Sequence, residues 1–262
     1  MDQPEILLTN DDGIEAAGHR ALYERLTEIG SVTAVAPATD QSAVGRALSH
    51  SAAVREHELG YEVDGTPSDC VIAGLSELVP DADLVVAGCN RGANLGAASL
   101  GRSGTVSAAV EATFFDVPAI AVSTYVPLGE YAAGDDLAVP REQYDEAARA
   151  GGYLAANAAA AGVFETAEYL NVNAPVADEA RGEMVVTEPS EGYYLEARRD
   201  DEEMIFENGA WELMGNGTLP DGSGTDRRAV IEGLTSVSPL TAPHTVGEAN
   251  GLDGLADGYG RD

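Results

Sequence analysis

Apolar and polar positions along the first 125 residues follow two alternating patterns. Short, nearly continuous apolar runs, typical of buried strands, are separated by stretches in which apolar residues recur every three or four positions, as on one helix face. This alternation predicts an α/β fold, with a parallel sheet and crossover helices. The predicted strands of this part are Glu5–Thr9, Ser31–Ala36, Asp83–Ala87 and Ala119–Ser123, with a hairpin over Ala52–Asp64.

Helix boundaries are marked most clearly around residue 66. Thr66 can cap a helix, Pro67 suits its first position, and Asp69 stands where a reciprocal capping partner belongs. The earliest helical stretch places Leu22 and Leu26 on one buried stripe. The predicted helices span about Ala16–Ile29, Pro67–Leu78, Gly104–Phe115 and Pro140–Ala161.

The pattern changes after Ser123. Tyr169–Asn173 is predicted to add a strand to the main sheet. Gly182–Leu195 and Ser236–Ala242 are typical of strands, and we expect them to form a smaller β-rich region, separated by the acidic stretch Arg199–Asp226. The last residues are rich in Gly, Asp and Ala, which predicts disorder. We therefore divide the chain into an α/β core of residues 1–175, a β-rich extension of residues 176–245 and a disordered acidic tail of residues 246–262.

The charge balance narrows the range of partners. The chain carries 45 acidic and 14 basic residues, all of the latter arginine, and its formal net charge is −31. Such a charge repels itself at low ionic strength, whereas in molar salt the Debye length falls to about 3 Å and the repulsion is screened. We interpret this as adaptation to a salt-rich cytoplasm; a merely acidic protein is the alternative. Nucleic-acid polymers are disfavoured as partners because they bind through Lys and Arg. A small anion needs a local reversal of the field, which a bound metal provides.

The expected location is the cytoplasm, without membrane contact. No run of about 18 apolar residues is present to span a bilayer, and Met1 leads into an apolar run without the basic flank of a secretory signal. The two cysteines, Cys70 and Cys89, have no metal-ligand spacing, and so few cysteines fit a reducing compartment.

Two adjacent carboxylates follow the first predicted strand, in Asn10-Asp11-Asp12-Gly13. Ligands of an open parallel sheet bind outside the carboxyl ends of its strands. Adjacent carboxylates repel one another unless a cation or hydrogen-bond donors hold them, and Mg²⁺ and Mn²⁺ prefer oxygen ligands. Asp11 and Asp12 are therefore a candidate metal site. An ordinary Asp-Gly turn, with one Asp capping the next helix, is an equally open alternative.

Two further loops at the same predicted edge carry polar side chains. The loop APATDQS, residues 36–42, offers hydroxyls and a carboxylate, although taken alone it is better explained as a plain solvated loop. The loop GCNRGANLG, residues 88–96, is followed by Ser103-Gly104-Thr105 at a helix start. Glycines allow close backbone approach and helix N-terminal amides bind anions, while Asn90 and Asn94 add an amide oxygen for a metal and an amide N–H for phosphate. A glycine-rich turn with Ser103 as an ordinary N-cap is the alternative.

Several other chemistries lack their sequence motifs. The phosphate loop GxxxxGK[ST] is missing, and so is a GxGxxG after the first strand. The four histidines have no zinc-site spacing. No GxSxG nucleophile elbow occurs, which leaves a serine hydrolase without support.

Taken in order, six segments resemble stretches of the survival protein SurE family of metal-dependent nucleotidases. Each motif alone is modestly specific, whereas all of them in order make a strong match that covers most of the chain. The segments are ILLTNDDGIEAAG (6–18), VAPATDQSAVGRALS (35–49), GTPSDCV (65–71), DLVVAGCNRGANLG (83–96), RSGTVSAAVEA (102–112) and GTDRRAVIEGLTSVSPL (224–240).

The resemblance implies a Rossmann-like, three-layer α/β core, a C-terminal β-rich arm that forms a homodimer or homotetramer, and 5′(3′)-nucleotidase activity. The substrate would be a nucleoside monophosphate, and the cofactor one divalent cation per subunit, Mg²⁺ or Mn²⁺. By matching position, the metal ligands are Asp11, Asp12, Ser42 and Asn90, and the phosphate-binding residues are Asn94, Ser103, Gly104 and Thr105.

The sequence departs from the family pattern at the rim of the predicted phosphate pocket. Ala97-Ala98 replaces an acidic or polar pair, Arg102 replaces an aromatic residue or His, and the stretch between Gly96 and Ser103 is one residue longer than usual. These departures leave the predicted metal ligands intact and bear on substrate preference. Arg102 is a candidate phosphate contact because it stands beside the turn in a chain with few cations.

The predicted reaction is in-line attack of water on a phosphate monoester, with no cofactor beyond the metal. Asp11 or Asp12 is also the candidate base that takes the proton from the attacking water. Short-chain polyphosphatase or broad phosphomonoesterase activity is the alternative within hydrolases. A non-catalytic nucleotide- and metal-binding module would keep the same loops and release no phosphate. A nicotinamide- or adenosyl-dependent enzyme is disfavoured because an acidic pair replaces the fingerprint loop.

Overall fold

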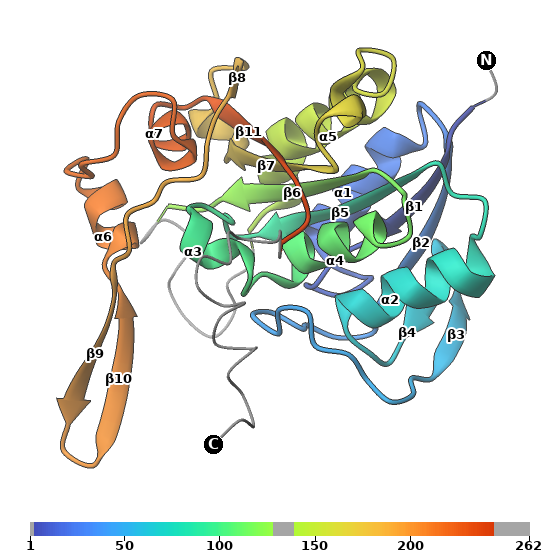
Figure 1. Cartoon of the computed structure of the whole chain (residues 1–262), viewed down its shortest axis with the longest axis horizontal. Helices are drawn as coiled ribbons and strands as arrows, with labels where there is room; N and C mark the ends of the chain where they lie inside the picture. Colours follow the sequence, from blue (N-terminus) through green and yellow to red (C-terminus); the bar gives the residue numbers. More distant parts are fainter. Residues whose placement is uncertain (1–2, 128–138, 244–262) are drawn as a thin grey trace, which may run out of the picture.

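A nine-stranded sheet forms the centre of the computed structural model, which describes residues 3–127 and 139–243 (Figure 1). Its six central strands are mutually parallel, and the strands next to them on either side run antiparallel. In spatial order the strands are β3 (Val54–His57), β4 (Gly60–Val63), β2 (Ser31–Pro37), β1 (Glu5–Thr9), β5 (Leu84–Arg91), β6 (Ala119–Tyr125), β7 (Tyr169–Pro175), β11 (Thr235–Leu240) and β8 (Met184–Val186).

Helices cover both faces of this sheet, which confirms the predicted three-layer α/β fold (Figure 1). Successive residues of β1 point to opposite faces, so Ile6 and Leu8 pack in one core and Leu7 in the other. The first core lies under α1 (Ala17–Leu26) and α5 (Asp145–Asn157), and the second lies under α2 (Pro67–Ala73) and α4 (Gly104–Thr113). Within the described ranges, no helix combines the length and apolarity needed to cross a lipid bilayer.

The helix start at Thr66 is confirmed in atomic detail. Thr66 Oγ1 accepts from the amide of Asp69 at 3.2 Å, and Asp69 Oδ2 accepts from the amide of Thr66 at 2.8 Å. The predicted helix continues past Ala73 as a π-helical turn, Gly74–Leu78. The predicted helix over Pro140–Ala161 is instead divided into a 3-10 turn, Arg141–Tyr144, followed by α5.

The strand predicted to end at Ala87 is longer than expected. β5 continues to Arg91, and the expected loop from Gly88 therefore begins as strand. The extra residues are held because β6 is also longer, pairing Asn90 with Ser123 and Arg91 with Thr124 after a register shift. The remainder of the expected loop contains a short helix, α3 (Ala97–Leu100).

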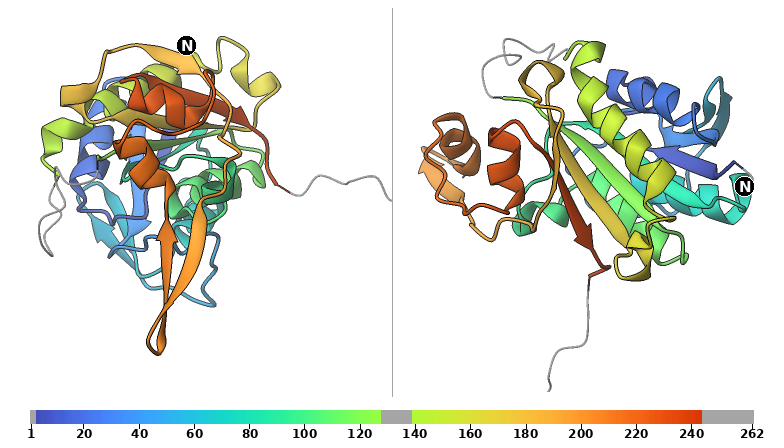
Figure 2. Two further views of the ribbon diagram at one scale, coloured as in Figure 1. Left: turned by 90° about the vertical axis from the view of Figure 1, so that its left-hand side faces the viewer. Right: turned by 90° about the horizontal axis from the view of Figure 1, so that it is seen from above.

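The two late strands were expected in a smaller β-rich region, and this expectation is wrong. β11 pairs antiparallel with β7, and β8 pairs with β11, so both extend the main sheet. The acidic stretch instead contains a separate hairpin of β9 (Leu195–Asp200) and β10 (Glu203–Asn208), which projects from the body (Figures 1 and 2). Two short helices follow, α6 (Ala210–Gly215) and α7 (Asp226–Ile231). The predicted disordered tail, 246–262, lies outside the described residues, and the division of the chain after residue 175 stays a prediction.

Candidate metal and phosphate site

The predicted site residues lie at the carboxyl ends of adjacent parallel strands. β1 is flanked by β2 on one side and by β5 on the other, so the chain changes direction across the sheet at this point. Such a switch point leaves a crevice outside the strand ends, where ligands of open α/β sheets bind. Asp11 and Asp12 follow β1, and Asn90 and Arg91 end β5. The sheet topology therefore brings these two segments to the same edge.

Asp11 is buried, with 3% of its surface exposed, against the amino end of α4. The Thr105 hydroxyl donates to Asp11 Oδ1 at 2.5 Å. Gly104 permits this approach, because a Cβ at that position would lie only 2.8 Å from the Cβ of Asp11. The predicted metal pair and the predicted phosphate turn are thus in direct contact, and the positive end of the helix faces a carboxylate.

Asp12 contacts the end of β5. The backbone amide of Arg91 donates to Asp12 Oδ2 at 2.7 Å. Burial raises the pKa of Asp11, and hydrogen bonds from Thr105 partly offset this. Burial and then the charge of Asp11 raise the pKa of Asp12 to about 6. The charge of Asp40 adds to both pKa shifts, so the pair sits in a field that favours a proton or a cation.

The loop that carries Ser42 is attached to the Asp11 turn. The amide of Gln41 donates to the carbonyl of Asp11 at 2.7 Å, and the amide of Ser42 donates to Asp40 Oδ1 at 2.7 Å. At the end of β5, Asn90 Nδ2 donates to the carbonyl of Gly92 at 2.6 Å, which leaves Oδ1 as the acceptor of that side chain. The backbone contacts bring these segments together, while a shared ion on the four side chains stays a prediction.

The available donors suit a hard cation. In the part of the chain that the structure describes, no group of three or more His, Cys, Asp or Glu side chains is placed to hold a metal. A cation at Asp11 and Asp12 would therefore draw on hydroxyl and amide oxygens such as those of Ser42 and Asn90. An all-oxygen set with two carboxylates fits Mg²⁺ or Mn²⁺ and does not fit a zinc site.

Asn94 is held by polar side chains of two core strands. Its amide donates to Asn173 Oδ1 at 2.7 Å, and its side-chain Nδ2 donates to Ser123 Oγ at 2.8 Å. Its carbonyl accepts from Nδ2 of Asn171 at 2.9 Å and of Asn173 at 3.2 Å. Sequence reasoning missed Ser123, Asn171 and Asn173. The signal was present, because polar side chains interrupt two otherwise apolar strands.

The turn before α4 combines a cap with the predicted phosphate residues. Ser103 Oγ accepts from the amide of Val106 at 3.0 Å, so Ser103 is an N-cap, as its alternative interpretation held. Arg102 is exposed, and its Nη1 donates to the carbonyl of Ala98 at 2.7 Å. Phosphate binding by Ser103, Gly104, Thr105 and Arg102 stays a prediction.

A cavity of about 300 Å³ opens beside Asp12. Tyr144, which precedes α5, forms one wall and is 3% exposed, and burial raises the pKa of its phenol. Arg91 supplies a cation on the same lining. Sequence reasoning assigned no role to Arg91 or Tyr144, although Arg91 is one of only 14 basic residues and follows Asn90 directly. The remaining lining residues are Ala16, Ala17, Asp40 and Val139.

Comparison with known proteins gives consistent matches. Residues 6–196 match the family described as survival protein SurE. A protein of Haloarcula marismortui named 5′-nucleotidase SurE is 62% identical over 259 residues, which is 99% of this chain and 96% of that protein. A protein of Natronomonas pharaonis with the same name is 57% identical over 97% of this chain and 99% of that protein. The crystal structure of the SurE protein from Aquifex aeolicus matches with a TM-score of 0.75 at 30% identity, covering 99% of this chain and 100% of that one.

Proposed function

The chain belongs to the survival protein SurE family, and from this premise we propose that it is a 5′-nucleotidase that uses a divalent cation to hydrolyse nucleoside monophosphates. The name shared by the relatives supports the nucleotidase activity. The observation that carries the proposal within this chain is the pair of buried carboxylates, Asp11 and Asp12, against the amino end of α4. That arrangement places carboxylate ligands for a cation next to the backbone amides at the start of α4, which can bind the phosphate.

Each part of the site then has a distinct task. Asp11 and Asp12 would hold the cation with oxygens of Ser42 and Asn90, and one of the two carboxylates would take the proton from the attacking water. Asn94 and the turn at Ser103-Gly104-Thr105 receive the phosphate. When bound, a divalent cation polarises the phosphoryl group and lowers the pKa of a nucleophilic water.

The cation also explains how so acidic a protein takes an anionic substrate. Without it, the buried carboxylates at Asp11 and Asp12 repel a phosphate. The two positive charges of the cation would balance those of Asp11 and Asp12 and remove this repulsion, although the net charge of the whole chain would change only from −31 to −29. The cavity beside Asp12 has room for part of the nucleoside, next to Arg91 and Tyr144.

A phosphate-release assay in molar KCl tests the proposal. The substrates are a 5′-mononucleotide, a 3′-mononucleotide, short-chain polyphosphate and p-nitrophenyl phosphate, each with Mg²⁺, Mn²⁺ or a chelator. We expect metal-dependent release that is fastest from the mononucleotides. Faster release from polyphosphate or from p-nitrophenyl phosphate would contradict the assignment of nucleoside monophosphates as the substrate. Nucleotide binding without any release would identify a non-catalytic module.

We further propose that the acidic surface adapts the enzyme to a salt-rich cytoplasm. The two relatives named above come from halophilic archaea, and the chain contains no lysine. Screening of a net charge of −31 should raise the melting temperature by ~10 °C or more between 0.1 M and 2 M KCl. Differential scanning calorimetry measures this directly. A melting temperature that is independent of KCl would contradict salt adaptation and favour the alternative of a merely acidic protein.

A further inference from the structure

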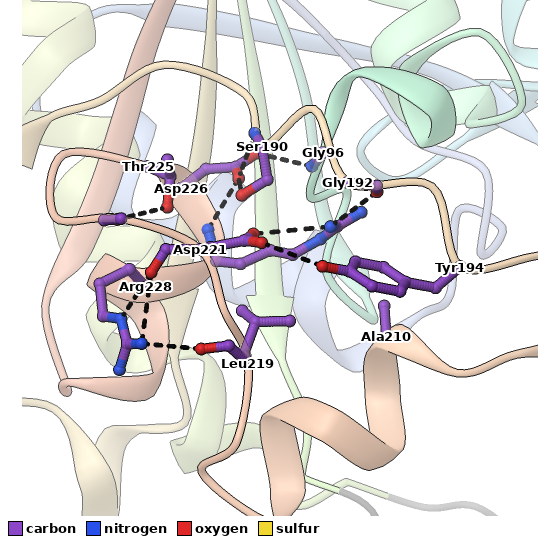
Figure 3. A network of polar contacts seen from close by, with 12 residues as sticks. Gly96, Ser190, Gly192, Tyr194, Ala210, Leu219, Asp221, Thr225, Asp226 and Arg228 are labelled. Carbon is purple, nitrogen blue, oxygen red and sulfur yellow. Dashed lines mark hydrogen bonds and ion pairs between the residues drawn. The ribbon is translucent and has the colours of Figure 1, made fainter.

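A buried carboxylate from the C-terminal part of the chain contacts the loop that carries Asn94. Asp226 lies in the first turn of α7 and has no exposed surface. Its Oδ2 accepts from the amide of Gly96 at 2.7 Å, across 130 residues of sequence. Its Oδ1 accepts from the amide of Ser190 at 2.9 Å, the Ser190 hydroxyl at 2.8 Å and the amide of Arg227 at 2.7 Å (Figure 3). Four donors thus converge on one carboxylate, and hydrogen bonds to an ionised acceptor are the strong ones.

Neighbouring contacts bind the same loop. The amide of Ala97 donates to the carbonyl of Ser190 at 3.0 Å, next to the bond from Gly96. The guanidinium of Arg227 covers Gly96 so closely that a Cβ there would lie 2.2 Å from Nη2. Gly96 also has a φ of +82°, which an L side chain rarely adopts. Only glycine can therefore occupy position 96 while its backbone contacts both Asp226 and Arg227.

The loop is held from its other side by the sheet. Two residues before Gly96, Asn94 is bound by Ser123, Asn171 and Asn173, as described above. The segment is bounded by Gly92 and Gly96, both with positive φ, so contacts with the rest of the fold have to fix its conformation. The sheet holds Asn94, the buried Leu95 packs in an apolar cluster that includes Val230 of α7, and Asp226 holds Gly96.

We propose that Asp226 is a positioning residue, which fixes the Gly96 amide and thereby holds Asn94 in place for the phosphate of the substrate. This rests on the proposed function, in which Asn94 binds phosphate. Stability alone is a weak explanation for Asp226, because a buried charged network stabilises a fold no better than well-packed apolar residues do. A misplacement of about 1 Å in a reacting site costs on the order of 10²-fold in rate. A contact that holds the loop in place can therefore raise the rate of reaction even if it adds little stability.

A double-mutant cycle tests the coupling. Asp226→Asn keeps the volume and removes the charge. We expect it to lower kcat/KM by ~10- to 100-fold in the native background. In an Asn94→Ala background the loss should shrink to less than about 3-fold, because the group being positioned is gone. An equal loss in both backgrounds would show that Asp226 acts on the fold alone and would overturn the proposal.

The control is a second buried acid that is remote from the loop. Glu146 accepts from the Thr235 hydroxyl at 3.0 Å, and its residue is 8% exposed. Glu146→Gln should change kcat/KM by less than about 3-fold in either background. If Asp226→Asn does not fold, the cycle is run with Ser190→Ala, which removes one donor to the carboxylate and should give a smaller loss of ~3-fold, again absent in the Asn94→Ala background.

Amide hydrogen exchange supplies a readout that needs no activity. Peptides covering residues 92–98 should exchange faster in Asp226→Asn than in the native protein or in Glu146→Gln. Unchanged exchange in an active enzyme would overturn the positioning role and leave the nucleotidase assignment intact. A native protein that releases no phosphate would overturn the nucleotidase assignment, while faster exchange would still support Asp226 as the residue that holds the loop.

Discussion

The sheet edge around Asp11 and the β9–β10 hairpin invert the usual distribution of side chains in opposite ways. At the edge, polar residues such as Asp11 and Asn94 are buried. On the hairpin, Met204 and Phe206 are 52% and 76% exposed, on the same face of a two-stranded ribbon. The first region hides groups that prefer water, and the second exposes groups that avoid it.

The two regions differ in where their contacts come from. Asp11 is bound by Thr105, which is 94 residues away, and Asn94 by Asn173, which is 79 residues away. Within the described ranges, β10 pairs only with β9, its neighbour in sequence. A lone two-stranded hairpin is marginally stable in water, and Met204 and Phe206 add exposed apolar surface to one face of it. One chain therefore assembles the edge, whereas we propose that the hairpin pairs with a second copy; the homodimer or homotetramer stays a prediction.

The largest expected effect is at the buried pair. Asp11→Asn or Asp12→Asn should lower kcat by on the order of 10³-fold or more, because each removes a cation ligand and a candidate base. The melting temperature without metal should not fall, since burial raises the pKa of both carboxyls and a neutral amide relieves the repulsion. Phosphate release and calorimetry measure the two quantities. Near-normal turnover in either variant would remove that carboxylate from the mechanism.

The next effect concerns assembly. We expect light scattering to give a multiple of 27.1 kDa for the native protein, and a single chain of 27.1 kDa once the apolar face of the hairpin is replaced, as in Met204→Ser with Phe206→Ser. Turnover per chain should change by less than about 3-fold, because neither residue contacts the described site. Glu203→Ser with Glu207→Ser, on the opposite face, is the matched control and should keep the native mass. A native mass in the apolar-face variant would mean that another surface forms the oligomer.

A smaller effect is expected in the pH dependence of stability without metal. Asp12 has a folded pKa of about 6 against an ordinary value of 3.8, so the folded state holds its proton more tightly. Stability should therefore be lost as pH rises from about 4 to above 6, by roughly 3 kcal/mol at most. Added Mg²⁺ should reverse the loss, because the cation would bind and stabilise the ionised form of Asp12.

That measurement needs the Asp12→Asn variant as its reference. Burial lowers the pKa of His19 to about 4, which makes the protein lose stability as pH falls below about 6.5 and so opposes the trend from Asp12. Urea unfolding of both proteins with a chelator at pH 5 and pH 8 cancels the contribution of His19. The free energy of unfolding of Asp12→Asn should rise relative to that of the native protein as pH increases. A difference that stays constant with pH would contradict the raised pKa of Asp12.

The smallest effect tests the rim of the phosphate pocket. Arg102→Ala should raise KM for a mononucleotide ~5-fold and leave kcat unchanged, a change of ~1 kcal/mol typical of an exposed charge pair. Arg46→Ala is the control, since that arginine pairs with Glu111 on the side of α4. If KM stays the same in Arg102→Ala, the bond of Arg102 to the carbonyl of Ala98 is its whole role.

Much of the fold follows from local pattern. The apolar run in Glu5–Thr9 and the capping residues Thr66 and Asp69 predict elements that the structure contains, because burial on one face and capping depend on residues close in sequence. The position of Asp11 and Asp12 at a strand end follows in the same way. The sequence by itself therefore determined the strands of the parallel core and the edge at which the candidate site was expected, because both follow from the run of apolar residues and the polar turn after it.

Tertiary structure alone decided which distant segments complete this edge. Nothing in the local pattern of Thr235–Leu240 shows that it pairs with β7 instead of forming a separate region. Nothing local shows that Asn173 and Asp226 reach the same loop from opposite sides. Periodicity records which face of an element is buried, whereas its partner depends on packing and register across loops of many tens of residues, which no short stretch of sequence contains.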